Sequence, residues 1–258
     1  MDLPLIPLES WQSFLLCFIR VVALVGSMPV FSGSQSPVKV RAGLAFMLAL
    51  VIFPAVRTHL PQVSMQPAGL LILMVQETLF GVILGFIGRL ILIAIQFGGT
   101  VLGYKMGFAS ANILDPQSEQ QVPLMGQFLN VVGILVFLSI DGHHIFLRAM
   151  ARSYEVIPPG GLDFSGETIP YVMKLTGDMF VLGVKLVAPM LVVLILSYFA
   201  LGIMSRLMPQ LNVLMLSFPI NISLGFIVLG LCLNLIIVLL GQEFHSLSRQ
   251  FVQLFQTL

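Results

Sequence analysis

Charged side chains are scarce in this sequence. Asp, Glu, Lys and Arg make up 9% of its 258 residues, against about 25% in typical soluble domains. Hydrophobic residues make up 58% and the mean hydropathy is +1.04. A chain of this composition has more apolar surface than a soluble fold could bury. The formal net charge of +1 supplies no global field that would attract a nucleic acid. The composition therefore predicts a membrane protein that does not bind nucleic acid.

Cysteines and catalytic motifs are also scarce. Cys17 and Cys232 lie inside apolar runs, where cysteine usually acts as a small buried hydrophobe. No HExxH, GxSxG, GxxxxGK[ST] or CxxC motif occurs. In Asp141-Gly142-His143-His144 the adjacent histidines would point about 100° apart on a helix. This favours a polar helix junction, in which Asp141 could cap the next helix, over a metal site. We expect a non-enzymatic protein without catalytic residue, metal or cofactor.

Long apolar runs dominate what is present. Residues 207–242 contain no charged side chain, yet include Pro219, Asn221 and Asn234. A spanning helix needs roughly 20 apolar residues, and proline or asparagine within it is tolerated mainly where neighbouring protein satisfies the polar groups. We therefore predict an all-α, polytopic protein with broken or kinked helices, forming a single domain over residues 1–258. Its apolar runs are 11–31, 42–56, 67–103, 122–140, 179–204 and 213–242.

A few charges interrupt the apolar runs, where each costs roughly 2.5–3.5 kcal/mol at the bilayer centre. Arg20 lies in mid-run, and Glu77 and Arg89 interrupt the long third run. On a helix, Glu77 and Arg89 would be separated by about 18 Å of rise and roughly 120° of rotation, so they cannot pair with each other. They could line an ion or proton path, or pair with other subunits. We favour pairing, and we predict it for Arg20, Glu77, Arg89 and Lys185.

Glycines are concentrated in and just after the third apolar run. Small residues at spacing i, i+4 let helix backbones approach closely in membranes. Simple glycine enrichment in membrane helices would explain isolated cases, but not such a dense group. We predict close helix packing at Gly81, Gly85, Gly88, Gly98, Gly99 and Gly103.

Three segments together resemble a known family. Residues 20–54 read RVVALVGSMPVFSGSQSPVKVRAGLAFMLALVIFP, residues 97–147 contain GYKMGFASANILDPQ and FLSIDGHHIFL, and residues 185–225 contain LGIMSRLMPQLNVLMLSFPINISLG. The combination resembles the FliR/SctT export-gate family of type III secretion systems, and the DPQ loop favours the flagellar branch. One departure is Asn221, where many relatives carry a basic residue.

The resemblance implies a subunit that forms a helical export gate with FliP and FliQ, next to FlhB and FlhA, in the bacterial inner membrane at the flagellar basal body. Unfolded flagellar proteins would pass through it, and membrane lipid would be a further partner, although the resemblance implies subunits lifted largely out of the bilayer plane. It also implies a FliQ-like helical hairpin at about 179–242 and a pore plug formed by residues 106–122. The implied plug residues are Met106, Gly107, Phe108, Ala109, Asn112, Asp115, Pro116, Gln117 and Glu119.

Two other kinds of protein remain as alternatives. A secondary transporter with broken helices would place Glu77, Arg89 and Pro189 at a midplane site. An injectisome export gate would share the family but serve a different machine. An intramembrane enzyme using Asp141 and His143 is the weakest alternative.

Overall fold

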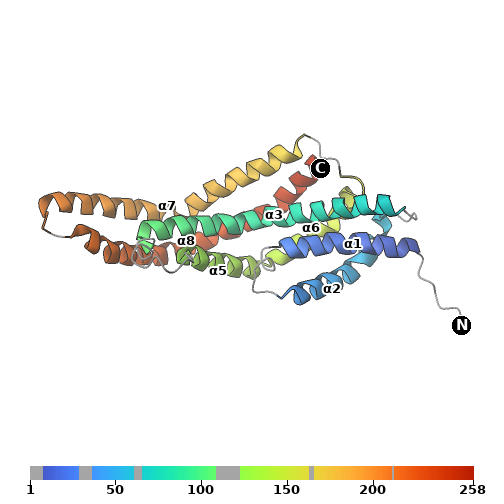
Figure 1. Ribbon diagram of the computed structural model, residues 1–258, viewed down its shortest axis with the longest axis horizontal. Helices are drawn as coiled ribbons and strands as arrows, with labels where there is room; N and C mark the ends of the chain where they lie inside the picture. The colour runs from blue at the N-terminus through green and yellow to red at the C-terminus, as the bar shows by residue number, and fades with distance from the viewer. Residues whose placement is uncertain (1–7, 29–36, 61–65, 109–122, 163–165, 211) are drawn as a thin grey trace. The chain divides into compact units, whose positions relative to one another are not determined.

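The computed structural model describes residues 8–28, 37–60, 66–108, 123–162, 166–210 and 212–258. Within these ranges every regular element is a helix and no strand occurs, which confirms the predicted all-α class (Figure 1). The elements are α1 (Leu8–Ser27), α2 (Val38–Val56), the 3-10 turn η1 (Arg57–His59), α3 (Pro67–Met106), α5 (Leu124–Ser139), α6 (Gly142–Val156), α7 (Thr168–Leu207) and α8 (Val213–Thr257).

Five helical segments are long and apolar enough to cross a membrane. The bent pair α5 and α6 makes a sixth candidate, which agrees with the predicted polytopic architecture. The 40 residues of α3 correspond to about 60 Å of helix, roughly twice the hydrocarbon thickness. The spans are Ser10–Ser27, Val38–His59, Pro67–Met106, Thr168–Leu207 and Met215–Thr257.

The last two helices extend well beyond the apolar runs expected at 179–204 and 213–242. Lys174 and Asp178 lie inside α7, and Glu243 and Arg249 lie inside α8. Charged residues end an apolar run but need not end a helix, because Glu, Lys and Arg are good helix formers. Much of the polar stretch 141–178 is consequently helical as well.

Proline and glycine mark several helix boundaries. Pro37 and Pro123 directly precede α2 and α5, and Pro67 is the first residue of α3. Proline suits a helix start because its fixed φ is helical and its missing N–H would have no partner in the first turn. At the other end of α3, Gly107 has φ 95°, a left-handed conformation that commonly terminates a helix.

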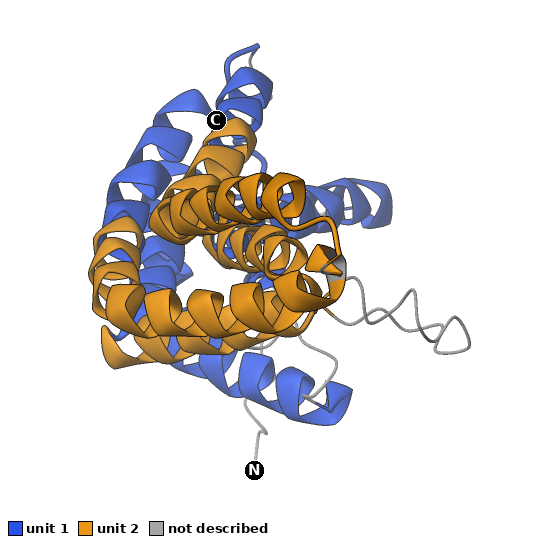
Figure 2. Ribbon diagram, turned by 90° about the vertical axis from the view of Figure 1, so that its left-hand side faces the viewer, with its two compact units in different colours: residues 1–90, 141–175, 244–258 blue, residues 91–140, 176–243 orange. Residues whose placement is uncertain are grey.

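The chain divides into two compact units, coloured separately in Figure 2. Unit 1 contains residues 1–90, 141–175 and 244–258, and unit 2 contains residues 91–140 and 176–243. Helices α3, α7 and α8 each contribute residues to both units. The single domain over 1–258 and its hairpin at 179–242 stay predictions.

Two pairs of aromatic side chains lie in the core of unit 1. Phe80 of α3 stacks on Phe255 of α8, with ring centroids 6.1 Å apart. Phe146 of α6 meets Phe251 edge to face at 5.3 Å. These rings are almost fully buried, so the C-terminal part of α8 is held by apolar contacts with α3 and α6.

Candidate functional site: a buried arginine cluster and the end of helix α3

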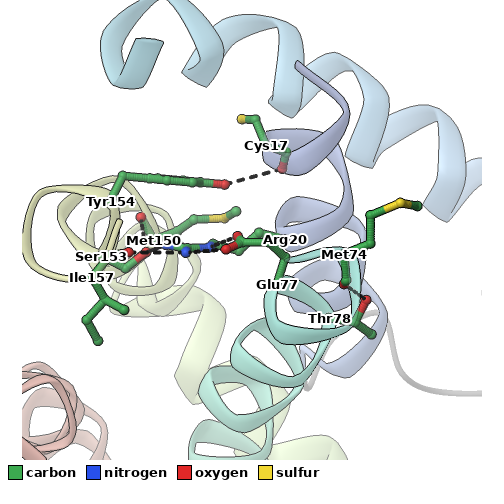
Figure 3. Close-up of polar contacts among 9 residues, drawn as sticks. All are labelled: Cys17, Arg20, Met74, Glu77, Thr78, Met150, Ser153, Tyr154 and Ile157. Atoms are coloured by element: carbon green, nitrogen blue, oxygen red, sulfur yellow. Dashed lines mark hydrogen bonds and ion pairs between the residues drawn. The ribbon is translucent and has the colours of Figure 1, made fainter. Parts of the chain in front are cut away.

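Arg20, in the middle of α1, lies in a fully buried polar cluster of unit 1. Its Nε and Nη2 donate to the two carboxylate oxygens of Glu77 in α3, with a distance of 2.9 Å from Nη2 to Oε1. Its Nη1 donates to Ser153 Oγ at 2.9 Å, and Nη2 also donates to the carbonyl oxygen of Ile157 at 3.2 Å. Figure 3 shows these contacts joining α1, α3 and the end of α6.

Aromatic rings enclose the same guanidinium. Its Cζ lies 4.5 Å from the Phe80 ring centroid and 4.1 Å from that of Tyr154, within the range of cation–π attraction. The Tyr154 hydroxyl donates to the carbonyl oxygen of Cys17 at 3.3 Å. Both charged side chains are 0% exposed. A buried ion pair is tolerated when further hydrogen bonds offset the lost hydration, and this cluster supplies them.

The cluster helps to decide whether the charges in the apolar runs line an ion or proton path or pair with other charges. An ion or proton path needs charges that a solute or water can reach, whereas Arg20 and Glu77 are enclosed by protein. The geometry therefore supports a clamp between helices. From the sequence both residues were expected to be paired, but not specifically with each other, because a separation of 57 positions does not indicate whether two residues meet in space. The only available signal was their opposite charge in two apolar runs.

Arg89 and Lys185, the other two residues of the predicted charge-pairing set, are both exposed. Neither makes an ion pair within the part of the chain that the structure describes. Within this chain alone the two side chains are therefore neither buried nor paired. Pairing with another subunit stays a prediction for both.

Three of the predicted packing glycines lie in unit 1, where a β-carbon would collide with a neighbouring helix. A Cβ at Gly81 would lie 2.7 Å from both Ala23 Cβ and the Arg20 carbonyl oxygen. A Cβ at Gly85 would overlap Ser27 of α1, and one at Gly88 would overlap the Phe146 ring of α6. These positions of α3 thus admit only glycine at the observed spacing.

The other three predicted glycines lie in unit 2. A Cβ at Gly98 would overlap the carbonyl oxygen of Gly183 in α7, and one at Gly99 would lie 2.8 Å from Gly126 Cα in α5. At Gly103 the nearest atom is Met125 Cβ, at 3.3 Å, so this contact is looser. Gly126 and Gly183 were not predicted, because each is isolated from the dense glycine group in sequence.

The C-terminal end of α3 is anchored by α7 and α8 within unit 2. The Tyr198 hydroxyl donates to the carbonyl oxygen of Lys105 at 2.8 Å. Met106 is fully buried, and a Cβ at Gly225 would lie 2.7 Å from its side chain. Phe108 meets Phe226 edge to face. Of the predicted plug residues, Met106, Gly107 and Phe108 are therefore held in place; Ala109, Asn112, Asp115, Pro116, Gln117 and Glu119 lie outside the described residues.

Asp141 precedes α6, as expected for a capping residue, but its side chain makes no capping hydrogen bond. Its backbone is left-handed, with φ 55° and ψ 35°. The carboxylate instead lies near His143 and His144. The capping role considered for Asp141 is thus wrong.

Comparison with known proteins identifies the family. Residues 11–247 match the model of "Bacterial export proteins, family 1". The chain belongs to this family. It is 33% identical over 240 residues to the flagellar biosynthetic protein FliR of Bacillus subtilis (strain 168), with 92% of each chain covered. Identity to the FliR of Pectobacterium carotovorum subsp. carotovorum is 31% over 228 residues (88% and 87% covered), and to that of Escherichia coli (strain K12) 28% over 232 residues (88% of each).

These matches confirm the resemblance to the FliR/SctT family that the sequence motifs indicated. The chain is accordingly a membrane protein of bacterial protein export and flagellum biogenesis. The relatives are named as biosynthetic export components and not as enzymes, in agreement with the expected non-enzymatic role.

Proposed function

We propose that this chain is a subunit of the flagellar type III protein export gate in the bacterial inner membrane. With FliP and FliQ it would form the channel through which unfolded flagellar subunits leave the cell, in contact with FlhB and FlhA at the basal body. The observation that carries the proposal is the family match over residues 11–247, combined with relatives named FliR that cover about nine tenths of the chain.

The exposed apolar faces support assembly with other subunits. Val51 of α2, Phe199 of α7 and Leu231 of α8 are 76%, 68% and 78% exposed. Lipid can cover only about 30 Å of a helix, whereas α3, α7 and α8 each have 40 or more residues. An apolar surface that extends beyond lipid needs protein to cover it. A hetero-oligomer would provide that cover.

The plug role of residues 106–122 is part of the same proposal. This segment contains Asp115, Glu119 and several amides between apolar helices, so it suits an aqueous channel better than lipid. Its start is anchored through Lys105 and Met106. Such anchoring would let the segment change its arrangement without loosening α3.

The observed contacts favour this gate over a secondary transporter. A midplane transport site would need Glu77 to reach a solute, but its carboxylate is buried and already bonded to Arg20. The names of the relatives favour the flagellar gate over its injectisome counterpart.

Co-purification tests the proposal. The chain is expressed with FliP and FliQ of the same bacterium and purified in detergent through a tag on this chain alone, and the native mass is measured. We expect one defined hetero-oligomer and little folded protein when the chain is expressed alone. A stable monomer or homo-oligomer with native helix content, unaffected by the partners, would contradict the gate and favour the transporter.

A further inference from the structure

Three side chains of metal-ligand type meet at the start of α6. Asp141 Oδ1 lies 3.7 Å from His144 Nδ1 and 3.9 Å from His143 Nε2. The three ligand atoms all lie within 4.8 Å of one another. We propose that Asp141, His143 and His144 form a binding site for a divalent transition-metal ion, with Zn²⁺ as the best fit.

Neither helix capping nor hydrogen bonding explains this cluster within the described part of the chain. The Asp141 side chain does not cap α6, and its distances to the imidazoles are too long for hydrogen bonds. His143 Nδ1 is buried without a hydrogen-bond partner. Asp141 also has a positive φ of 55°, which is uncommon for a residue other than glycine. The chain thus holds three ligand groups within ion-pair distance of one another, without hydrogen bonds between them.

Adjacent histidines on a helix point in different directions, which argues against both binding one metal ion. Here the two imidazoles use different ring nitrogens, and this removes the objection. Their Cβ atoms leave the helix in different directions, but His143 presents its distal Nε2 and His144 its proximal Nδ1 to the same carboxylate oxygen. The ring centroids are 4.2 Å apart, with 38° between the planes. Both imidazoles therefore place a ring nitrogen near the same carboxylate oxygen.

The two separations from Asp141 are close to those that zinc requires, and the third ligand pair lies within 4.8 Å. Zinc binds nitrogen and oxygen at about 2.0–2.2 Å in tetrahedral geometry, so neighbouring ligand atoms lie roughly 3.4 Å apart. Closing the observed 3.7 and 3.9 Å to that value needs only small side-chain rotations. The side chains are free to make them, since Asp141, His143 and His144 are 73%, 37% and 54% exposed. The fourth position would remain open to water.

The donor set also determines the class of ion. Two imidazoles and one carboxylate suit Zn²⁺, Ni²⁺ or Cu²⁺, whereas Mg²⁺ and Ca²⁺ prefer oxygen ligands throughout. Metal binding would tie Asp141 to the first turn of α6, the helix that carries Ser153 of the arginine cluster. We therefore expect bound zinc to raise the melting temperature of the protein.

The test measures Zn²⁺ binding to the full-length protein, in whatever complex it purifies, using a tag without histidine. After chelator treatment and removal of the chelator, zinc chloride is titrated calorimetrically and zinc content is measured by mass spectrometry. We expect one Zn²⁺ per chain, not displaced by millimolar Mg²⁺. Asp141→Asn and His144→Ala should each weaken binding at least about tenfold, a typical loss when a metal site is disturbed.

His59→Ala is the matched control, because His59 is an exposed histidine outside the cluster. It should bind zinc like the parent chain. The near-isosteric Asp141→Asn keeps the comparison valid if His144→Ala reduces the yield. Absence of stoichiometric zinc in the parent, or unchanged binding by His143→Ala/His144→Ala, would overturn the proposal. So would an equal loss in His59→Ala, which would indicate non-specific surface binding.

Discussion

Arg20 of α1 and Glu77 of α3 form a two-point ion pair, although 57 positions separate them in the sequence. Both side chains are completely buried, and Phe80 and Tyr154 lie against the guanidinium. The pair also reaches α6 through Ser153. Three helices of unit 1 are thereby tied together at one point, so changes at this point should affect the stability of the whole unit.

The first prediction concerns removal of one charge. Glu77→Met leaves the guanidinium buried without its counter-ion and should destabilise the protein by about 3–5 kcal/mol. Arg20→Met/Glu77→Met should recover most of that loss, because apolar replacement of a buried pair is often neutral. The thermal stability of the purified protein measures both effects. Arg152→Met, at an exposed position beside Ser153 in α6, is the control; an equal loss there would rule out a special role for the pair.

The second prediction concerns close packing at Gly85. Gly85→Leu places a side chain where Ser27 of α1 already lies, and overpacking typically costs about 1–3 kcal/mol. We expect assembly of the complex and motility to fail while the chain still reaches the membrane. In the same helix a Cβ at Gly69 meets nothing within 4 Å, so Gly69→Leu should assemble normally. Normal yield and motility with Gly85→Leu would disprove the packing argument.

A third prediction applies the same reasoning to unit 2. Gly183→Ala puts a methyl group 2.7 Å from the Ala94 carbonyl oxygen. Backbone cannot move aside as easily as a flexible side chain, so we expect a loss of about 1–3 kcal/mol. Gly202→Ala, also in α7 but with open space around it, should be neutral or slightly stabilising. Thermal unfolding of the two variants decides between these outcomes, and equal melting temperatures would contradict the prediction.

The fourth prediction tests the proposed plug. Deletion of residues 109–119 should leave the complex assembled but leaky, because the segment proposed to fill the channel is lost. Single-channel conductance or entry of a small solute into cells measures the leak. An assembled deletion complex with the conductance of the parent would mean that the segment is only a connector between α3 and α5.

A fifth prediction tests the anchor of α3. Tyr198→Phe removes the hydrogen bond to the Lys105 carbonyl oxygen, worth about 0.5–1.5 kcal/mol. If the end of α3 positions the plug, this variant should raise the leak conductance without reducing assembly. Tyr104→Phe is the matched control, since Tyr104 is 56% exposed and its hydroxyl makes no hydrogen bond in the described part of the chain. Equal conductance of both variants would show that the anchor has no part in closure.

For much of the candidate site, the sequence predicted which types of residue are involved but not which residues contact each other. The glycines of α3 could be expected at close helix contacts, because small residues at helical spacing are recognisable within one segment. Their partners, such as Ser27 and Gly183, lie in other segments and could not be inferred. For Asp141 the sequence position suggested a cap, but the left-handed backbone turned its carboxylate to the histidines instead.

The sequence by itself determined the membrane class, the helical content and the family, since hydropathy and short motifs are properties of neighbouring residues. It determined the ends of α7 and α8 poorly, because apolar runs and helices end for different reasons. Only the tertiary structure decided that Arg20 meets Glu77, that Arg89 and Lys185 stay exposed, and that one carboxylate faces two imidazoles. Such relationships depend on which helix faces pack together, and the spacing of residues along the chain does not specify that.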